Sequence, residues 1–195
     1  VNVFARRYFG GGGHRRYKTV APFGGAKGVM STNPLAMAMP AEEGVPLSAD
    51  FATSSSAGGK LRLAQRKGVS LPPGQILDKE GRPSVNPADF FDGGVMLPSA
   101  GAKGSGLGMI NELLCFGLLG EPLEFNWILL AFRLDALCDR ESYQERAREF
   151  IRLVNKTPPA QGFSSVYYPG QLEAARESAN RKRGVAIDEN IARLL

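Results

Sequence analysis

The sequence is poor in the residues on which many enzymes and small scaffolds depend. It holds one histidine, two cysteines and one tryptophan in 195 residues. The cysteines, Cys115 and Cys138, lie in apolar segments, which predicts buried thiols in a reducing compartment and neither a disulfide framework nor a metal site. No apolar run reaches the roughly 18–20 residues that span a bilayer, and the first residues lack the apolar region of a signal peptide. We therefore expect a soluble cytoplasmic protein.

The common local signatures of catalysis are also missing. The chain has no Walker A, CxxC, HExxH or GxSxG sequence, and the GSGLG stretch at 104–108 is not the Rossmann fingerprint because Met109 stands where the third glycine belongs. His14 follows four glycines and has no carboxylate nearby to orient it, which argues against a general base. On spacing alone, the sequence supports an α/β domain with a possible anion site and nothing more specific.

The positive charge is confined to one end of the chain. The formal net charge is +5, yet the first thirty residues contain six bases and no acid, so the remainder is close to neutral. We read residues 1–19 as an irregular basic lead-in, because the glycines at 10–13 interrupt any regular element. A nucleic-acid-binding domain would rest on this segment alone, so we expect neither a nucleic acid nor a membrane as partner.

The most distinctive stretch is 101–120, GAKGSGLGMINELLCFGLLG. Four glycines surround Lys103, and an apolar pattern of helical period follows. A helix that is apolar nearly all round is usually buried, so we expect a core helix. Its glycine-rich, basic start could bind a phosphate or carboxylate through unpaired backbone N–H groups. The alternative is a glycine-rich turn into a core helix, with Lys103 merely solvated.

Elsewhere, strands and helices alternate, which is typical of the α/β class. A period-2 alternation of bulky and small residues predicts a strand at 35–39, and we expect further strands at 46–56, 93–98, 125–134 and 163–168. Helical periods predict helices at 58–68, around 143–154 and at 171–183. The proline-rich segment 69–92 should be an exposed connection. Asp50 lies among apolar neighbours, where a buried carboxylate would require hydrogen bonds.

Five motifs in order resemble the malate/L-lactate dehydrogenase family of NAD(P)-dependent oxidoreductases, which includes ureidoglycolate and sulfolactate dehydrogenases and piperideine-2-carboxylate reductases. The resemblance covers about residues 20–195. The motifs are STNPLAMAMP (31–40), PLSADFATS (46–54), AGGK (57–60), VMLPSAGAKGSGLGMINELLCFGLLG (95–120) and YPGQLEAARESANRKRGVAI (168–187).

The resemblance implies a mixed sheet flanked by helices, in a non-Rossmann fold that binds NAD or NADP and is incomplete here. It implies that Lys60 lies near the substrate, which makes it the candidate catalytic residue, and that Asn33 and Pro34 shape the loop beside the cleft. The implied cofactor-binding residues are Asp50, Phe51, Ala52, Thr53, Ser54, Lys103, Gly104, Pro169, Gly170 and Gln171.

Two hypotheses of function follow from the resemblance. The first is the cofactor-binding part of a dehydrogenase that moves a hydride between the nicotinamide and a small 2-hydroxy or 2-keto acid, as a homodimer. The family's N-terminal segment with its catalytic serine and histidine is missing, and His14 does not fit the histidine motif, so we expect a truncated member. The second is a non-catalytic remnant that serves as a dimerisation or interaction module.

Overall fold

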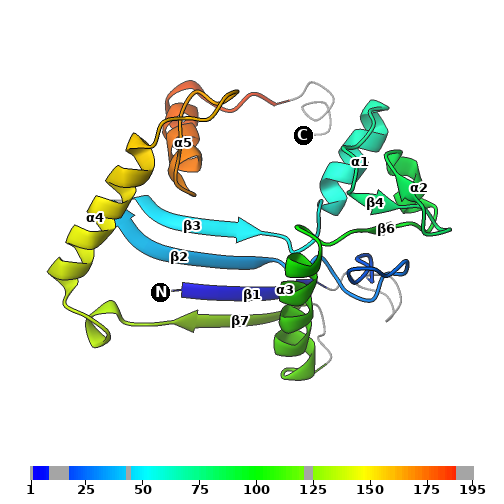
Figure 1. The fold of residues 1–195 in the computed structure, drawn as a ribbon, viewed down its shortest axis with the longest axis horizontal. Coiled ribbons are helices and arrows are strands. Elements are labelled where there is room, and N and C mark those ends of the chain that lie inside the picture. The colour runs from blue at the N-terminus through cyan, green and yellow to red at the C-terminus, as the bar shows by residue number, and fades with distance from the viewer. Residues whose placement is uncertain (1, 9–17, 43–44, 121–124, 188–195) are drawn as a thin grey trace. The chain divides into compact units, whose positions relative to one another are not determined.

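Helices and strands alternate along the chain, which confirms the α/β class (Figure 1). The computed structural model describes residues 2–8, 18–42, 45–120 and 125–187. These residues divide into two compact units. The larger unit comprises Asn2–Met37 and Asp50–Ala131, and the smaller unit comprises mainly Ala38–Ala49 and Phe132–Leu195.

Four strands form a sheet in the order β3-β2-β1-β7. The strands β2 (Leu35–Glu42), β3 (Val45–Phe51) and β7 (Phe125–Ala131) correspond to three predicted strands. β3 ends at Phe51, five residues earlier than predicted, because Ser54 leaves the strand to bridge Pro98 instead.

The expectation that residues 1–19 are irregular is wrong for their first part. Asn2–Tyr8 form the strand β1, which pairs antiparallel with β7, so that Asn2 lies opposite Ala131 and Tyr8 opposite Phe125. This pairing joins segments that are far apart in the sequence, so a local sequence pattern cannot predict it. Residues 9–17, with the four glycines and His14, lie outside the described residues.

A second, three-stranded sheet contains β4 (Ile76–Leu77), β5 (Pro83–Ser84) and β6 (Val95–Met96) in the order β5-β4-β6, beside α1 (Gly58–Lys67) and α2 (Pro87–Phe91). The expectation of an exposed connection over 69–92 is therefore correct only in part: much of the segment is exposed, but it also forms β4, β5 and α2. Leu71 and Ile76 from this segment enter the core of the larger unit, because short strands between turns still point one face inward. This core consists of Val20, Met30, Leu61, Leu71, Ile76 and Met96.

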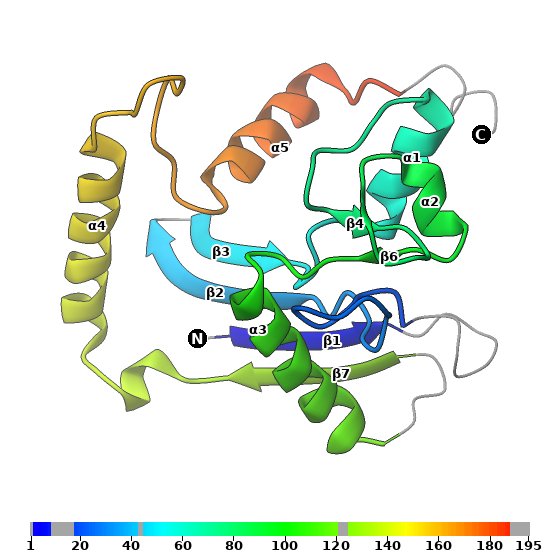
Figure 2. The same cartoon turned by 45° about the vertical axis from the view of Figure 1, so that its right-hand side comes forward.

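The predicted glycine-rich helix is present but faces the opposite way. α3 (Ala102–Glu112) continues into a π-helical turn, η1 (Leu113–Gly117), and both contact β1 on one face of the sheet (Figure 2). The buried side is small or polar, and most of the bulky apolar residues are exposed, so the expectation of a core helix is wrong. The buried residues of α3 and η1 are Gly104, Ser105, Gly108, Asn111 and Cys115.

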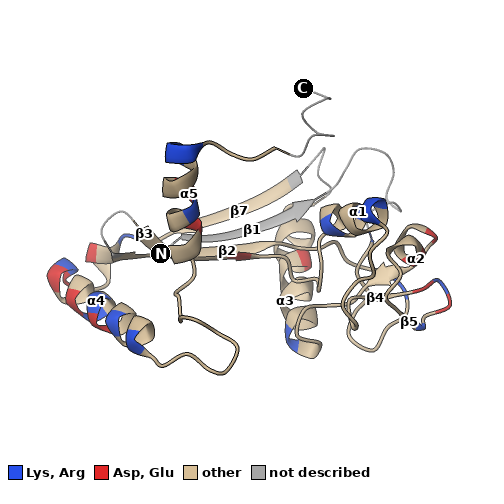
Figure 3. Cartoon of the chain, turned by 90° about the horizontal axis from the view of Figure 1, so that it is seen from above, with Lys and Arg blue, Asp and Glu red and all other residues tan. Residues whose placement is uncertain are grey.

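The smaller unit contains the 3₁₀ turn η2 (Leu134–Ala136) and the helices α4 (Arg140–Lys156) and α5 (Gln171–Arg183). α4 buries Ile151 and presents charges of both signs to solvent (Figure 3). α5 ends in three basic residues before Gly184, as predicted. The strand predicted at 163–168 is absent: this segment is irregular within the smaller unit.

Candidate functional site

The segment that follows β3 is built into the larger unit by its backbone. The Thr53 N–H donates to Thr32 O at 2.9 Å, and the Ser99 N–H donates to Thr53 O at 2.9 Å. The hydroxyls of Thr53 and Ser54 also donate, to Thr32 O at 3.1 Å and to Ser56 O at 2.6 Å. Both residues are buried, so they fix the wall of the predicted site; each hydroxyl keeps acceptor capacity toward a ligand.

The three residues before Thr53 lie at the surface of the same unit. Asp50 and Phe51 are exposed, and Ala52 is half-buried. Asp50 has apolar neighbours in the sequence, but because it is exposed its carboxylate does not need the hydrogen bonds that a buried one would require. An exposed Asp50 can accept hydrogen bonds from a ligand without a desolvation cost.

Glycines bring the start of α3 against this wall. A Cβ built on Gly104 would lie 1.9 Å from Ser99 O, and a Cβ on Gly108 would lie 3.1 Å from Thr53 Oγ1. The residues Thr53, Ser99 and Gly104 are therefore brought together, and only glycine at 104 permits the contact.

The N-terminus of α3 is open and basic. Gly101 precedes the helix with φ 61°, and Lys103 is exposed in the first turn, which carries no acid. The first backbone N–H groups of a helix lack internal partners and carry partial positive charge. Lys103 and Gly104 thus have the arrangement that an anion site needs.

Ala100 lies beside the candidate site, and the sequence did not single it out. It has φ 50°, one of two non-glycine residues with positive φ among the described residues, and it comes directly before the α3 cap. A left-handed alanine is strained, and such strain gathers at functional sites. Nothing in the local sequence marks an alanine for this conformation.

The other positive-φ residue is Asn33, with φ 39°, which lies fully buried in the loop before β2. Its Nδ2 donates to Gly108 O at 2.9 Å, and Asn111 Nδ2 donates to Asn33 O at 3.1 Å. Asn33 Oδ1 has no hydrogen-bond partner among the described residues. These bonds tie the loop to α3, in keeping with its predicted shaping role.

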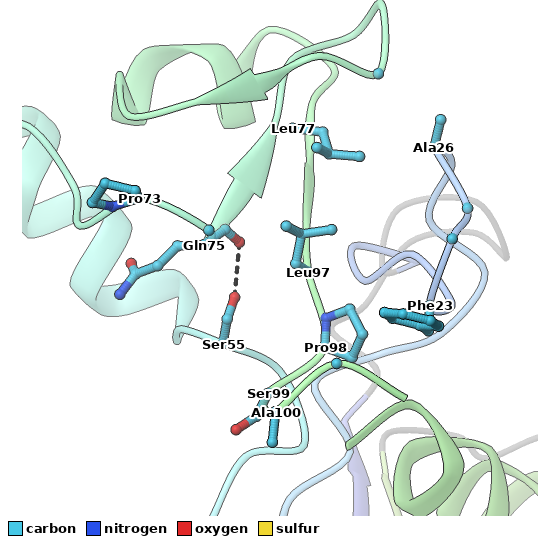
Figure 4. A pocket seen from close by; sticks show the side chains of 15 residues that line it. Phe23, Ala26, Ser55, Pro73, Gln75, Leu77, Leu97, Pro98, Ser99 and Ala100 are labelled. Atoms are coloured by element: carbon cyan, nitrogen blue, oxygen red, sulfur yellow. Dashed lines mark hydrogen bonds between the residues drawn. The ribbon is translucent and has the colours of Figure 1, made fainter. Parts of the chain in front are cut away.

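A cavity of about 630 Å³ adjoins the start of α3 within the larger unit (Figure 4). Ala100 and Gly101 form one part of its wall, and Phe23, Ser55 and Gln75 form others. The Gly24–Gly25 turn that carries Phe23 is visible in the sequence, but its approach to α3 is not.

The remaining predicted site residues lie outside the segments that surround the start of α3. Lys60 is exposed in the first turn of α1, in the larger unit. Pro169, Gly170 and Gln171 lie in the smaller unit, at the start of α5.

The turn before α5 is fixed to β3 inside the smaller unit. The Ser48 N–H donates to Pro169 O at 3.0 Å, and the Gln171 N–H donates to Tyr168 O at 3.2 Å. Gly170 has φ 99°, and a Cβ there would lie 2.7 Å from Pro46 O. The turn therefore requires glycine at 170, both for its positive φ and because a Cβ would clash with Pro46 O. Pro169 lies at the surface.

The chain resembles proteins of known activity over nearly all of its length. It is 32% identical over 191 residues to the ureidoglycolate dehydrogenase (NAD(+)) of Escherichia coli (strain K12), covering 90% of this chain and 54% of that protein. It is 36% identical over 198 residues to an L-lactate dehydrogenase of Cupriavidus necator, covering 92% of this chain and 56% of that protein. The chain thus spans about half the length of the curated relatives it matches.

Solved structures agree with these relatives. The sulfolactate dehydrogenase of Methanocaldococcus jannaschii superposes with a TM-score of 0.79 at 28% identity, over 97% of this chain and 55% of that one. The Δ1-piperideine-2-carboxylate reductase of Pseudomonas syringae pv. tomato gives a TM-score of 0.80 at 26% identity, over 99% of this chain and 59% of that one. The family model for malate/L-lactate dehydrogenases matches residues 13–195. The chain belongs to the malate/L-lactate dehydrogenase family.

Proposed function

We propose that this chain supplies the nicotinamide-dinucleotide site of an oxidoreductase that moves a hydride between NAD or NADP and a small 2-hydroxy or 2-keto acid. The observation that carries the proposal is the open N-terminus of α3, where Lys103 and Gly104 adjoin the Thr53–Ser99 wall. Dinucleotide phosphates need such a combination of unpaired N–H groups and positive charge. The names of the relatives, dehydrogenases and a reductase, support the reaction class.

The other predicted residues complete the proposed assignment. Asp50, Phe51 and Ala52 line the site of the nicotinamide nucleotide beside Thr53 and Ser54. The Pro169–Gly170–Gln171 turn contacts the phosphates or ribose of the cofactor. Lys60 pairs with the carboxylate of the substrate. The proposed domain comprises residues 20–195, and the two thiols, Cys115 and Cys138, support the reducing cytoplasm as its compartment.

Charge removal at the start of α3 tests the cofactor assignment. Lys103→Ala should weaken NADH binding about tenfold, since one charge-assisted contact is worth roughly 1.4 kcal/mol. Lys67→Ala is the matched control. Lys67 is an exposed lysine at the C-terminal end of α1 in the same unit, and its removal should leave the affinity for NADH unchanged. Equal affinities for the wild type and Lys103→Ala would contradict the assignment.

Lys60→Ala tests the proposed substrate contact in the same fluorescence assay. It should leave NADH affinity unchanged and weaken the effect of pyruvate, used as a 2-keto acid probe, on the fluorescence of bound NADH. An unchanged pyruvate response would remove Lys60 from the site.

An exposed apolar face favours the homodimer and keeps the non-catalytic module as a second candidate. Bulky residues along α3 and η1 face solvent, and Leu113 is 69% and Leu118 71% exposed. We call the exposed apolar residues of α3, η1 and the turn after them the apolar patch. Its residues are Leu107, Met109, Ile110, Leu113, Leu114 and Leu118, and an exposed apolar patch of this kind is typical of an interaction surface.

We propose that a second copy covers this patch. Ile110→Glu or Leu113→Glu should weaken dimerisation by about tenfold or more, because each removes the burial of one large apolar side chain. Light scattering after size-exclusion chromatography measures the change, with Leu63→Glu on α1 as the exposed-leucine control. A monomeric wild type would refute the dimer, and a dimer that fails to bind NADH would favour the non-catalytic module.

A further inference from the structure

The smaller unit contains another cavity, of about 330 Å³, between α4 and the paired strands β2 and β3. Figure 1 shows α4 beside the end of β2. Among the described residues that line this cavity, none is assigned above to the cofactor or to the substrate. Its volume lies at the lower end of the range of pockets that enclose small molecules, which begins at roughly 300 Å³. The cavity is therefore a candidate binding site in its own right.

The walls of this cavity are apolar. Met39 comes from β2 and Leu47 from β3, and α4 contributes Ala147, Phe150 and Ile151. Ile151 is buried and Phe150 is 57% exposed, so the cavity extends from the interior of the unit to its surface. Hydrocarbon that enters such a hollow is removed from water together with the walls, which favours binding. These walls suit an alkyl chain or an aromatic ring.

Tyr143 fixes the two sides of the cavity to each other. Its hydroxyl donates to Pro40 O at 2.6 Å, which ties α4 to β2. Burial, and then the neighbouring Cys138, raise the pKa of Tyr143 above its ordinary value, so the hydroxyl stays protonated and keeps donating at neutral pH. Since its one proton is engaged, Tyr143 cannot donate to a ligand.

Arg146 is the one charged side chain among the described residues that line the cavity. It is exposed and forms no ion pair with the described residues, although it helps to lower the pKa of Asp139. α4 as a whole carries five basic and three acidic residues, so its local charge is positive. A guanidinium group can bind a carboxylate through two parallel N–H···O bonds. Arg146 therefore adds a preference for a negative charge to an otherwise apolar site.

We propose that this cavity binds a small amphipathic carboxylate, with its alkyl chain or aromatic ring against Met39, Leu47 and Phe150 and its carboxylate paired with Arg146. The inference goes beyond the proposed function and does not depend on it. The guanidinium group distinguishes this ligand from a neutral hydrocarbon. The apolar walls distinguish it from a short polar acid such as pyruvate, which has too little hydrocarbon to fill them.

Calorimetric titrations of the full chain with octanoate, phenylacetate and 1-octanol test the site. The two acids separate an alkyl chain from an aromatic ring, and 1-octanol has the chain of octanoate without its charge. At least one acid should bind with saturation, and octanoate should bind more tightly than 1-octanol. Arg146→Met should weaken the binding of the acid about fivefold and leave 1-octanol binding unchanged, because it removes the charge and keeps an apolar stem.

Arg148→Met is the matched control for this charge. Arg148 is exposed on the same helix and does not line the cavity, so its removal should leave the affinity for the acid unchanged.

A variant that fills the cavity provides a second test. Ala147→Leu should weaken the binding of octanoate and of 1-octanol more than about tenfold, because the added groups displace at least two methylenes of the ligand, each worth about fourfold. Leucine is nearly as good a helix former as alanine, so α4 should form as before. Thermal unfolding followed by circular dichroism should therefore occur at the wild-type temperature or above it.

The outcomes separate this site from the proposed dinucleotide site. Acid binding that both Arg146→Met and Ala147→Leu weaken, and that NADH does not displace, would support the inference. Binding that neither variant changes would place the acid elsewhere, for example on the apolar patch, and would overturn it. Displacement of the acid by NADH or pyruvate would also overturn it, as would failure of all three ligands to bind a folded wild type, whether or not NADH binds.

Discussion

Gly104 and Gly106 are neighbours on α3 with opposite surroundings. The Cα of Gly104 lies so close to the Ser99 carbonyl that no side chain fits, whereas a Cβ on Gly106 would meet no atom within 4 Å. The first glycine lets the helix start approach the wall of the predicted site. Gly106 makes no such close approach in the described structure, although both glycines belong to one glycine-rich run of the sequence.

This contrast predicts opposite effects of the same substitution. Gly104→Ala should destabilise the fold by about 3 kcal/mol or more, since the methyl group would overlap backbone atoms that cannot easily move. Gly106→Ala should stabilise it by roughly 0.5–1 kcal/mol, because alanine restricts the unfolded chain and favours the helix. Urea unfolding of the two variants measures both changes in stability. A Gly104→Ala variant as stable as the wild type would contradict the close approach of α3 to Ser99.

At the scale of elements, periodicity predicted which segments are helices better than which face each helix buries. α1 and α5 match the expected ranges to within one residue, and α4 contains its predicted stripe, because capping residues and apolar spacing are local signals. α3 did not follow its apolar pattern. Small residues pack closer to the Ser99 segment than leucines can, so the glycine face is buried and Leu113 is left outside.

The start of α4 is a local signal with a consequence for pH dependence. Asp139 caps the helix, and its carboxylate accepts from the Ser142 N–H at 2.8 Å. This backbone hydrogen bond, first among several causes, lowers the pKa of Asp139 below its ordinary value. A lowered pKa means that the stabilisation is fully present above the unfolded-state pKa and is lost as the pH falls through the folded-state pKa.

Asp139→Ala should therefore be less stable than the wild type near neutral pH and equally stable at about pH 2, where both lack the charge. Asp139→Asn should keep much of the cap at both values, since asparagine is an equally good N-cap. Chemical unfolding at the two pH values measures the differences. A difference between Asp139→Ala and the wild type that is as large at pH 2 as at pH 7 would contradict the role of the charged cap.

At the scale of the whole molecule, the order of the motifs carried more information than any one of them. Recognition of the family is confirmed by the family model over residues 13–195. The predicted cofactor residues fall on both units, with Lys103 in the larger and Gly170 in the smaller. The pairing of β1 with β7, the left-handed Ala100 and the cavity beside Phe23 arise from contacts between distant segments, so no local pattern could have predicted them.

We propose above that this chain, which spans 54% of the length of the Escherichia coli ureidoglycolate dehydrogenase, binds a nicotinamide dinucleotide. The most direct test is a fluorescence titration of the purified wild-type chain with NADH and with NADPH. We expect saturable, micromolar-range binding of at least one of them, and the ratio of the two affinities would identify the preferred cofactor. No binding of either to a sample that circular dichroism shows to be folded would contradict the claim.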